Sequence, residues 1–196
     1  MANRLLLFGK MAHIVLASSS PRRKELLQQL GLDFEIYSPD IDESVHENEL
    51  VHHYVERLAR EKAQTVLKLF PEAIVIAADT SLGLDGQIIG KPESKSHAFE
   101  IWKQLSGRWH DVFSGLCIAT QQQLLSQVVQ TQVEFQHLTT QDMEDYWTTG
   151  EPVGKAGGYA IQGIASQYIP QIQGSYSNVV GLPLYEFAQL LKRVKT

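Results

Sequence analysis

The sequence predicts an α/β fold built around a mixed sheet. The apolar run 73–78 is unbroken, as in a strand buried on both faces. Asp85-Gly86 lies between two short apolar runs and is the strongest local signal for a β-hairpin. Segments with helical periodicity separate these strands, so both hairpin-joined and isolated strands belong to one sheet. At 196 residues and 22.0 kDa, the chain fits one domain whose core needs no disulfides.

In the first half of the chain, a strand at 13–17 leads into a helix whose start is marked by Ser20 as N-cap and Pro21 in the first turn. Gly31 ends this helix. The segments expected next are a strand at 34–38, an acidic loop at 40–44, a helix at 49–70 and the strand at 73–78.

In the second half, the hairpin comprises strands 81–84 and 87–89. Thr139 and Asp142 form a capping box for a helix that ends at Gly150. A glycine-rich strand is expected at 155–163, and an amphipathic helix begins near Pro183. The remaining predicted elements are a helix at 94–105 and strands at 112–120 and 125–135.

Composition limits where the protein works and what it binds. The formal charge of −5 argues against binding long nucleic acid. No apolar run approaches the roughly 20 residues of a membrane span, and no signal peptide is present, so a cytoplasmic protein without membrane contact is expected. The lone Cys117 fits a reducing compartment. Residues 1–10 are predicted to be an extension outside the fold, and 11–196 a single domain.

Several common motifs are excluded. Gly90-Lys91 resembles the end of a P-loop, but Pro92 stands where a magnesium-binding Ser or Thr is required. The histidines near residue 50 lack the spacing of a zinc-binding helix. Cys117 lies in an apolar run, where a thiol is usually inert.

Arg22 and Arg23 occupy the first turn of the first helix, where the helix dipole disfavours cations. A phosphate held by the backbone amides, serine hydroxyls such as that of Ser18, and an arginine would remove this conflict. Exposure of both arginines to solvent explains the pattern equally well.

Lys62 lies near the centre of the apolar stripe of the helix at 49–70. Its side chain either extends along its aliphatic stem to solvent, or its ammonium is held inside against a carboxylate or a bound anion. The central position on the stripe favours the second interpretation.

Asp79 ends the buried strand 73–78, and α/β folds tend to bind ligands at such strand ends. Strict alternation places Asp79 and Lys91 on opposite faces of the hairpin, so one cleft can hold both only if the strand end is irregular. Glu43, beside Asp42, adds a second carboxylate, and two carboxylates with phosphate oxygens often hold magnesium. An exposed acidic turn explains Asp42-Glu43 equally well.

The segment 155–163 combines a cation, Lys155, with glycines that permit close approach of a ligand and with Gln162, whose amide can read the edge of a base. A bulged strand is the structural alternative. Cations from four segments and carboxylates from two more together predict a triphosphate and metal site.

These residues resemble the motifs of the Maf family. The matching segments, in the order of the family, are Leu16-Ala17-Ser18-Ser19-Ser20-Pro21-Arg22-Arg23, Asp42-Glu43-Ser44, Leu58-Ala59-Arg60-Glu61-Lys62-Ala63, Ala78-Asp79-Thr80, Gly90-Lys91-Pro92 and Lys155-Ala156-Gly157. The resemblance covers about 13–192. It implies a Maf/ITPase-like fold, with a twisted mixed sheet, flanking helices and two lobes around a central cleft. It also implies a nucleoside triphosphate pyrophosphatase that releases a nucleoside monophosphate and pyrophosphate.

The resemblance also assigns roles to residues. It makes Asp79 the proton acceptor and a metal ligand together with Glu43, and it implies a divalent cation, Mg²⁺ or Mn²⁺. Arg22, Lys62 and Lys91 would bind phosphates. The segment 159–163 is similar to that of the subgroup acting on dTTP and UTP, in which Arg22, Thr80 and Gln162 influence specificity. A homodimer is expected on the same basis.

Two alternatives stay open. One is a non-catalytic nucleotide-binding regulator of cell division, which would use the same cations without turnover. The other is a pyrophosphatase for purine-analogue triphosphates. The presence of both Asp79 and Glu43 favours an enzyme over the regulator.

Overall fold

The computed structural model describes residues 13–194, so the extension predicted at 1–10 and the first residues of the predicted domain lie outside the described part. Within that part, seven strands form one mixed sheet in the order β2-β1-β3-β5-β6-β7, with β4 paired to β3. The strands are β1 (Ile14–Leu16), β2 (Glu35–Ile36), β3 (Ile74–Leu84), β4 (Gln87–Ile89), β5 (Trp109–Ala119), β6 (Leu124–Glu134) and β7 (Gln171–Gln173). Strand β1 is parallel to β2 and β3, and the other pairs are antiparallel. The predicted fold class is confirmed.

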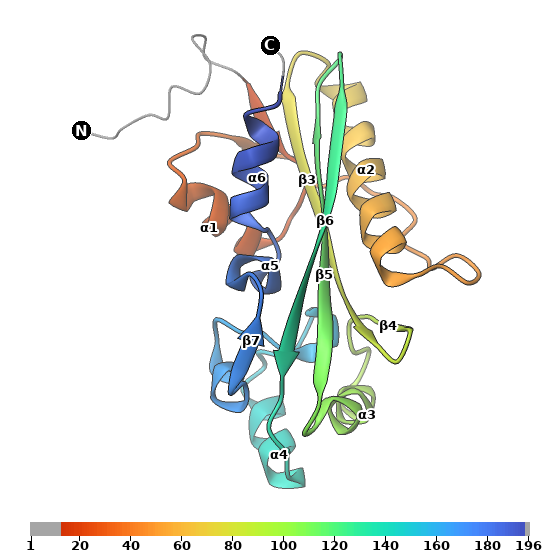
Figure 1. The fold of residues 1–196 in the computed structure, drawn as a ribbon, viewed down its shortest axis with the longest axis vertical. Helices are drawn as coiled ribbons and strands as arrows, with labels where there is room; N and C mark the ends of the chain where they lie inside the picture. The colour runs from red at the N-terminus through yellow and green to blue at the C-terminus, as the bar shows by residue number, and fades with distance from the viewer. Residues whose placement is uncertain (1–12, 195–196) are drawn as a thin grey trace.

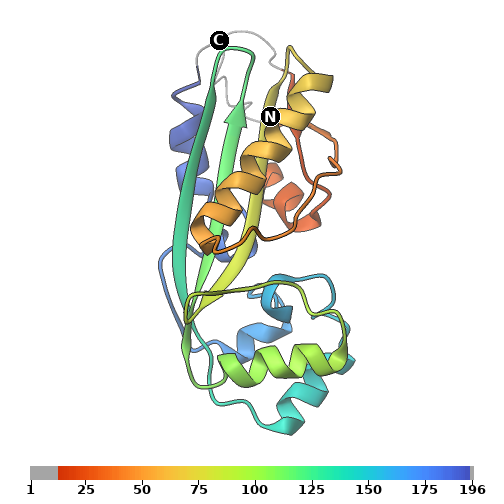
Figure 2. The ribbon, with the colours of Figure 1, turned by 90° about the vertical axis from the view of Figure 1, so that its right-hand side faces the viewer.

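Three long strands, β3, β5 and β6, run through the whole molecule and carry a lobe at each end (Figure 1). Helices α1 (Pro21–Gln29) and α6 (Leu184–Leu191) lie against one face of the upper half of the sheet, and α2 (Val51–Leu69) lies against the other. The lower lobe contains α3 (Lys95–Leu105) and α4 (Thr140–Thr148), as Figure 2 shows. Three short elements, α5 (Tyr176–Val180) and the 3₁₀ turns η1 (Ala156–Gly158) and η2 (Ile164–Tyr168), complete the described chain.

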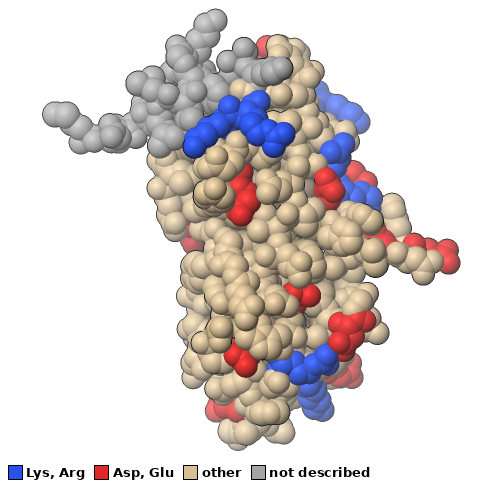
Figure 3. Space-filling view, in the orientation of Figure 1, with Lys and Arg blue, Asp and Glu red and all other residues tan. Residues whose placement is uncertain are grey.

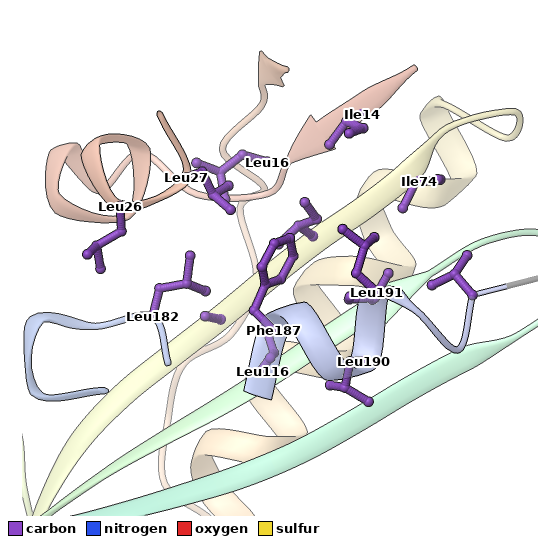
Figure 4. Close-up of a cluster of buried hydrophobic side chains, with 14 of the residues drawn as sticks. Ile14, Leu16, Leu26, Leu27, Ile74, Leu116, Leu182, Phe187, Leu190 and Leu191 are labelled. Atoms are coloured by element: carbon purple, nitrogen blue, oxygen red, sulfur yellow. The ribbon is translucent and has the colours of Figure 1, made fainter. Parts of the chain in front are cut away.

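Separate hydrophobic clusters stabilise the two lobes. In the upper lobe, α1 and α6 pack on the sheet through Leu27, Phe187 and Leu191, all almost fully buried (Figure 4). A second cluster on the opposite face joins α2 to the same strands. The lower lobe has its own core around Trp102. Burial of large apolar side chains in each lobe therefore fixes both ends of the long strands. The boundary between the lobes lies between these clusters.

Helix α2 approaches β5 closely at Gly115. A Cβ atom at this position would lie 2.1 Å from the carbonyl oxygen of Val55, so only glycine permits the contact. This close approach presses the face of α2 that carries Lys62 onto the sheet.

The structure corrects the sequence-based expectations in three places. The runs 73–78 and 81–84 belong to one continuous strand, β3, because Asp79 and Thr80 pair with β5 without interruption. The expected strand at 155–163 is instead the turn η1 followed by loop, because Gly157 and Gly158 adopt φ values of 67° that a strand excludes. Elements β7 and α5 were not predicted. The capping box of α4 is confirmed.

Charged residues are dispersed over the surface. On the face seen in Figure 3, Lys and Arg lie in small groups among Asp and Glu, with no broad basic surface on that face. Within residues 13–194, no helix combines the length and apolar character needed to cross a bilayer.

Candidate active site

A cleft of about 310 Å³ lies between the two lobes. The loop after β1 and the start of α1 form its upper wall with residues 17–23. The lower wall comes from Lys91 and from the segment between Gly154 and Gln162, while Asp79 and Thr80 of β3 form part of its floor. The cleft between two lobes that the resemblance implies is therefore present.

Lys62 binds two carboxylates at the centre of this cleft. Its Nζ lies 2.6 Å from Oδ1 of Asp79 and 2.6 Å from Oε1 of Glu43. Lys62 and Asp79 are each 8% exposed. An ammonium this deeply buried costs several kcal/mol unless it is paired, so the carboxylates account for its place on the apolar face of α2. The interpretation that the ammonium is held inside is borne out.

The cations around Glu43 keep its carboxylate ionised. Burial alone would raise the pKa of Glu43, but the hydrogen bond from Lys62 and the charges of Lys62, Lys91 and Arg23 lower it below its usual value. Tyr54 responds in the opposite direction, because burial and the negative charges of Asp79 and Glu43 raise its pKa to about 12. Its hydroxyl therefore remains a donor, and it hydrogen-bonds the carbonyl oxygen of Glu43 at 2.9 Å.

Helix α2 also fixes the loop that carries Glu43. The Arg57 guanidinium donates to both carboxylate oxygens of Glu49, at 2.7 and 2.8 Å, and to the carbonyl oxygen of Ser44 at 2.9 Å. Tyr54 and Arg57, one turn apart on α2, therefore bind the consecutive carbonyl oxygens of Glu43 and Ser44. The same helix thus positions both Lys62 and its partner Glu43.

The two adjacent arginines have different surroundings. Arg23 is half-buried and joins three segments, since it donates to Ser18 Oγ at 3.1 Å, Thr80 Oγ1 at 3.2 Å and the carbonyl oxygen of Gly181 at 2.9 Å. Arg22 donates from Nε to the carbonyl oxygen of Val180 at 3.3 Å, and burial lowers its pKa. Both side chains line the cleft and are not simply solvated.

Lys91 reaches the cleft because it lies beyond the end of its strand. Strand β4 stops at Ile89, and Lys91 Nζ lies 4.0 Å from Oε2 of Glu43, with a side chain that is 62% exposed. The irregular strand end needed to bring Lys91 and Asp79 into one cleft is therefore observed.

The remaining two candidates lie on the lower lobe. Gln162 is exposed and lines the cleft. Lys155 stands between the lining residues Gly154 and Ala156, but its ammonium donates to the carbonyl oxygens of Glu151 and Val153. Burial and the nearby charge of Arg22 lower the pKa of Lys155, but Lys155 itself is not among the residues that line the cleft.

The donor set around Lys62 fits a divalent cation that is shared with a ligand. Two carboxylates already direct their oxygens at one positive charge. Within residues 13–194, no three His, Cys, Asp or Glu side chains gather into a self-sufficient metal site. Glu43 and Asp79 would therefore hold a cation only together with oxygens from a bound phosphate, which is a usual arrangement for Mg²⁺.

Sequence reasoning missed several residues that shape the cleft. The sequence does not predict the pair of Arg57 and Glu49, because the two residues are eight positions apart and Glu49 precedes the helix that contains Arg57. His110 is almost fully buried, and its Nε2 pairs with the hydroxyl of the cleft residue Tyr159 at 2.7 Å. Burial lowers the pKa of His110 to about 3. No local pattern connects residues 49 positions apart, so only the side-chain contact in the structure reveals this pair.

The fold and the cleft define an α/β protein with a cleft between two lobes that is lined by four cations and two carboxylates. The chain belongs to the Maf family, because the family model described as "Maf-like protein" matches residues 13–194.

Relatives of known name cover almost the whole chain. The "dTTP/UTP pyrophosphatase" of Acinetobacter baylyi is 70% identical over 92% of this chain and 98% of its own length. The protein of the same name from Colwellia psychrerythraea is 48% identical over 91% of this chain and 86% of its own length. Among solved structures, a "Nucleoside-triphosphatase / dITP/XTP pyrophosphatase" from Mycobacterium abscessus has a TM-score of 0.44 and 18% identity, covering 64% of this chain and 75% of that one.

The clamp on the Glu43 loop predicts a pH-dependent contribution to stability. The hydrogen bonds from Arg57 lower the pKa of Glu49 from 4.5 to about 2. A lowered pKa stabilises the fold above the ordinary pKa of the group, and this stabilisation is lost as the pH falls through the folded value. We expect Glu49→Gln to reduce the free energy of unfolding at pH 7, and the difference from wild type to shrink between pH 4.5 and 2.

Urea denaturation at a series of pH values measures this difference. Glu47→Gln is the matched control, because Glu47 is exposed in the same loop and forms no ion pair with the described residues. A difference between Glu49→Gln and wild type that stays constant over this pH range would contradict the assignment.

Proposed function

We propose that the protein is a nucleoside triphosphate pyrophosphatase that hydrolyses dTTP and UTP to the nucleoside monophosphate and pyrophosphate. The observation that carries the proposal is the cleft in which Lys62 joins Asp79 and Glu43, with Arg22, Arg23 and Lys91 around them. The names of relatives that share 70% and 48% of their aligned residues with this chain support the same substrates.

The charges of the cleft match a metal-bound triphosphate. Four cations and two carboxylates line it, which gives a net charge of +2. A fully ionised triphosphate with one divalent cation carries a net charge of roughly −2. Fixed positive side chains in a partly enclosed cleft stabilise the phosphate oxygens more than mobile counterions in water do, because they need no reorganisation during the reaction.

Asp79 is the proposed general base. Its Oδ1 is held by Lys62, whereas Oδ2 makes no hydrogen bond to the described residues and is available to accept a proton. Water attacks the α-phosphorus, the bond from this phosphorus to the bridging oxygen breaks, and pyrophosphate leaves with the bonding electrons. Asp79 takes the proton that the water loses.

Glu43 and Asp79 are the proposed ligands of a divalent cation, Mg²⁺ or Mn²⁺. When bound, the cation supplies positive charge to the phosphate oxygens. The ammonium of Lys62, which pairs with both carboxylates, would balance negative charge on the phosphate oxygens from its place in the cleft.

The base of the nucleotide is proposed to contact residues at the two walls of the cleft. Arg22 and Thr80 lie on the upper wall and the floor, and Gln162 lies on the lower wall. The amide of Gln162 offers both a donor and an acceptor, as recognition of a pyrimidine edge requires. Ser18, Arg23 and Lys155 complete the set of proposed substrate-binding residues.

The non-catalytic regulator is not favoured, because relatives named as pyrophosphatases align over nearly their whole length. A purine-analogue pyrophosphatase would prefer ITP and XTP over dTTP, which a nucleotide panel distinguishes. A homodimer and a cytoplasmic location remain predictions.

Replacement of Asp79 tests the proposed base. Asp79→Asn keeps the size of the side chain and leaves Lys62 paired with Glu43, so folding should be retained. We expect kcat for dTTP to fall about 10²- to 10⁴-fold, since this is the usual contribution of general base catalysis. The exposed helix residue Asp145 provides the control Asp145→Asn. A folded Asp79→Asn enzyme with near-normal kcat would remove Asp79 from this role.

Replacement of Gln162 tests base recognition. Gln162→Glu exchanges the amide donor for a second acceptor and adds a negative charge. We expect kcat/KM for dTTP and UTP to fall relative to purine nucleoside triphosphates. Gln167→Glu makes the same chemical change at an exposed residue that does not line the cleft. If the ranking of nucleotides is the same in wild type and Gln162→Glu, Gln162 does not read the base.

A further inference from the structure

The loop that carries Gln162 has no strand partner, although it forms much of the lower wall of the cleft. It follows η1 and precedes η2, and Ala156, Tyr159, Ala160 and Gln162 line the cleft. A residue that discriminates between bases must be held in place, because a loose contact gains little affinity and little selectivity. Groups outside the cleft must therefore fix this loop.

Glu151 holds the loop on the C-terminal side of Gln162. Its Oε2 accepts a hydrogen bond from the backbone N–H of Ile164 at 2.8 Å, and its Oε1 accepts one from Ala165 at 3.1 Å. These are the first N–H groups of η2, which have no partner within the turn itself. A carboxylate 13 residues away in sequence thus caps η2.

Tyr146 holds the loop on the N-terminal side of Gln162. Its hydroxyl donates to Oε1 of Glu151 at 2.7 Å and accepts the buried N–H of Ala160 at 3.3 Å. Tyr146 and Glu151 are therefore hydrogen-bonded to each other and to the backbone on both sides of Gln162. They bind Ala160 before it, and Ile164 and Ala165 after it.

The fit between Glu151 and the loop is close. A Cβ atom at Gly163, the residue after Gln162, would lie 2.0 Å from Oε2 of Glu151. Burial would raise the pKa of Glu151, but the hydrogen bonds from Ile164, Tyr146 and Ala165 lower it, so the carboxylate is ionised and its bonds are charge-assisted. The ring of Tyr146 packs beside Trp102 at 5.2 Å between centroids.

We propose that Glu151 and Tyr146 are positioning residues for Gln162, and that their contacts set the discrimination between pyrimidine and purine nucleotides. This inference rests on the proposed function, in which Gln162 contacts the base. Both residues act through the loop backbone, and neither lines the cleft. Their loss should therefore change KM and the ranking of substrates and leave kcat nearly unchanged.

Tyr146→Phe is the sharpest test, because it removes the hydroxyl and keeps the ring that packs on Trp102. Glu151→Gln replaces one acceptor oxygen with a donor and so loses at least one bond to η2. We expect each to lower kcat/KM for dTTP and UTP about tenfold through KM, which is the size of effect that losing one hydrogen bond produces. Purine nucleotides should be affected less.

The control is Glu144→Gln on the same helix. Glu144 pairs with Lys95 at the surface, with a side chain that is 42% exposed, and this pair does not touch the loop. Thermal unfolding of each variant shows whether it is folded. If Glu151→Gln does not fold, Tyr146→Phe alone decides the question.

A double-mutant cycle separates positioning from a general structural effect. In a Gln162→Ala background, adding Tyr146→Phe should no longer alter the ratio of kcat/KM between dTTP and purine nucleotides, because both changes act through the same side chain. An equal change of the ratio in both backgrounds would overturn the proposal. An unchanged ratio in Tyr146→Phe alone would also overturn it.

These outcomes differ from failure of the proposed function. If the wild-type protein hydrolyses no nucleoside triphosphate, that function is wrong. The positioning role of Tyr146 and Glu151 is then tested by measuring the affinity for an α,β-methylene analogue of dUTP by calorimetry. Tyr146→Phe should weaken this binding about tenfold relative to Glu144→Gln. Equal affinities of the two variants would refute the positioning role.

Discussion

The ammonium of Lys62 is the charge on which the cleft depends. It is buried, and it binds the carboxylate of Asp79 on β3 and that of Glu43 in a loop, both at 2.6 Å. A buried ammonium without partners would cost several kcal/mol, and the ion pairs with Asp79 and Glu43 offset this cost. The three side chains together carry one net negative charge. Arg22, Arg23 and Lys91 surround this group. The result is a cleft lined by four cations and two carboxylates, as the proposed binding of a triphosphate and a divalent cation requires.

The fold supplies this arrangement through α2 and β3. Close contact at Gly115 presses α2 on the sheet, which brings Lys62 to Asp79. The same helix clamps the loop of Glu43 through Tyr54 and Arg57. Strand β3 spans both lobes, so the residue at its midpoint faces the boundary between them. The lower lobe then contributes a wall that the bonds of Glu151 and Tyr146 hold in place.

Elements that depend on contacts between residues close in sequence could be predicted from the sequence, and those that depend on distant residues could not. Helices marked by a cap, such as α1 and α4, or by an apolar stripe, such as α2, depend on residues three to seven apart. The predicted ends of these helices lie within two residues of the observed ends. Lys62 was found for the same reason, because its place on an apolar stripe is visible in one helix. The loop at 155–163 was misassigned, since its conformation depends on positive φ angles and on Glu151 and Tyr146. Partners such as Glu49 for Arg57, or His110 for Tyr159, follow no local rule and need coordinates.

The central claim is that the cleft aligns a metal-bound triphosphate for attack of water at the α-phosphorus. Phosphorus NMR of the purified protein with dTTP and Mg²⁺, and with the cation removed by a chelator, tests this claim most directly. The account predicts equimolar dTMP and pyrophosphate, formed only while the cation is present. Formation of dTDP and inorganic phosphate, or dTTP that stays intact with Mg²⁺ present, would contradict it.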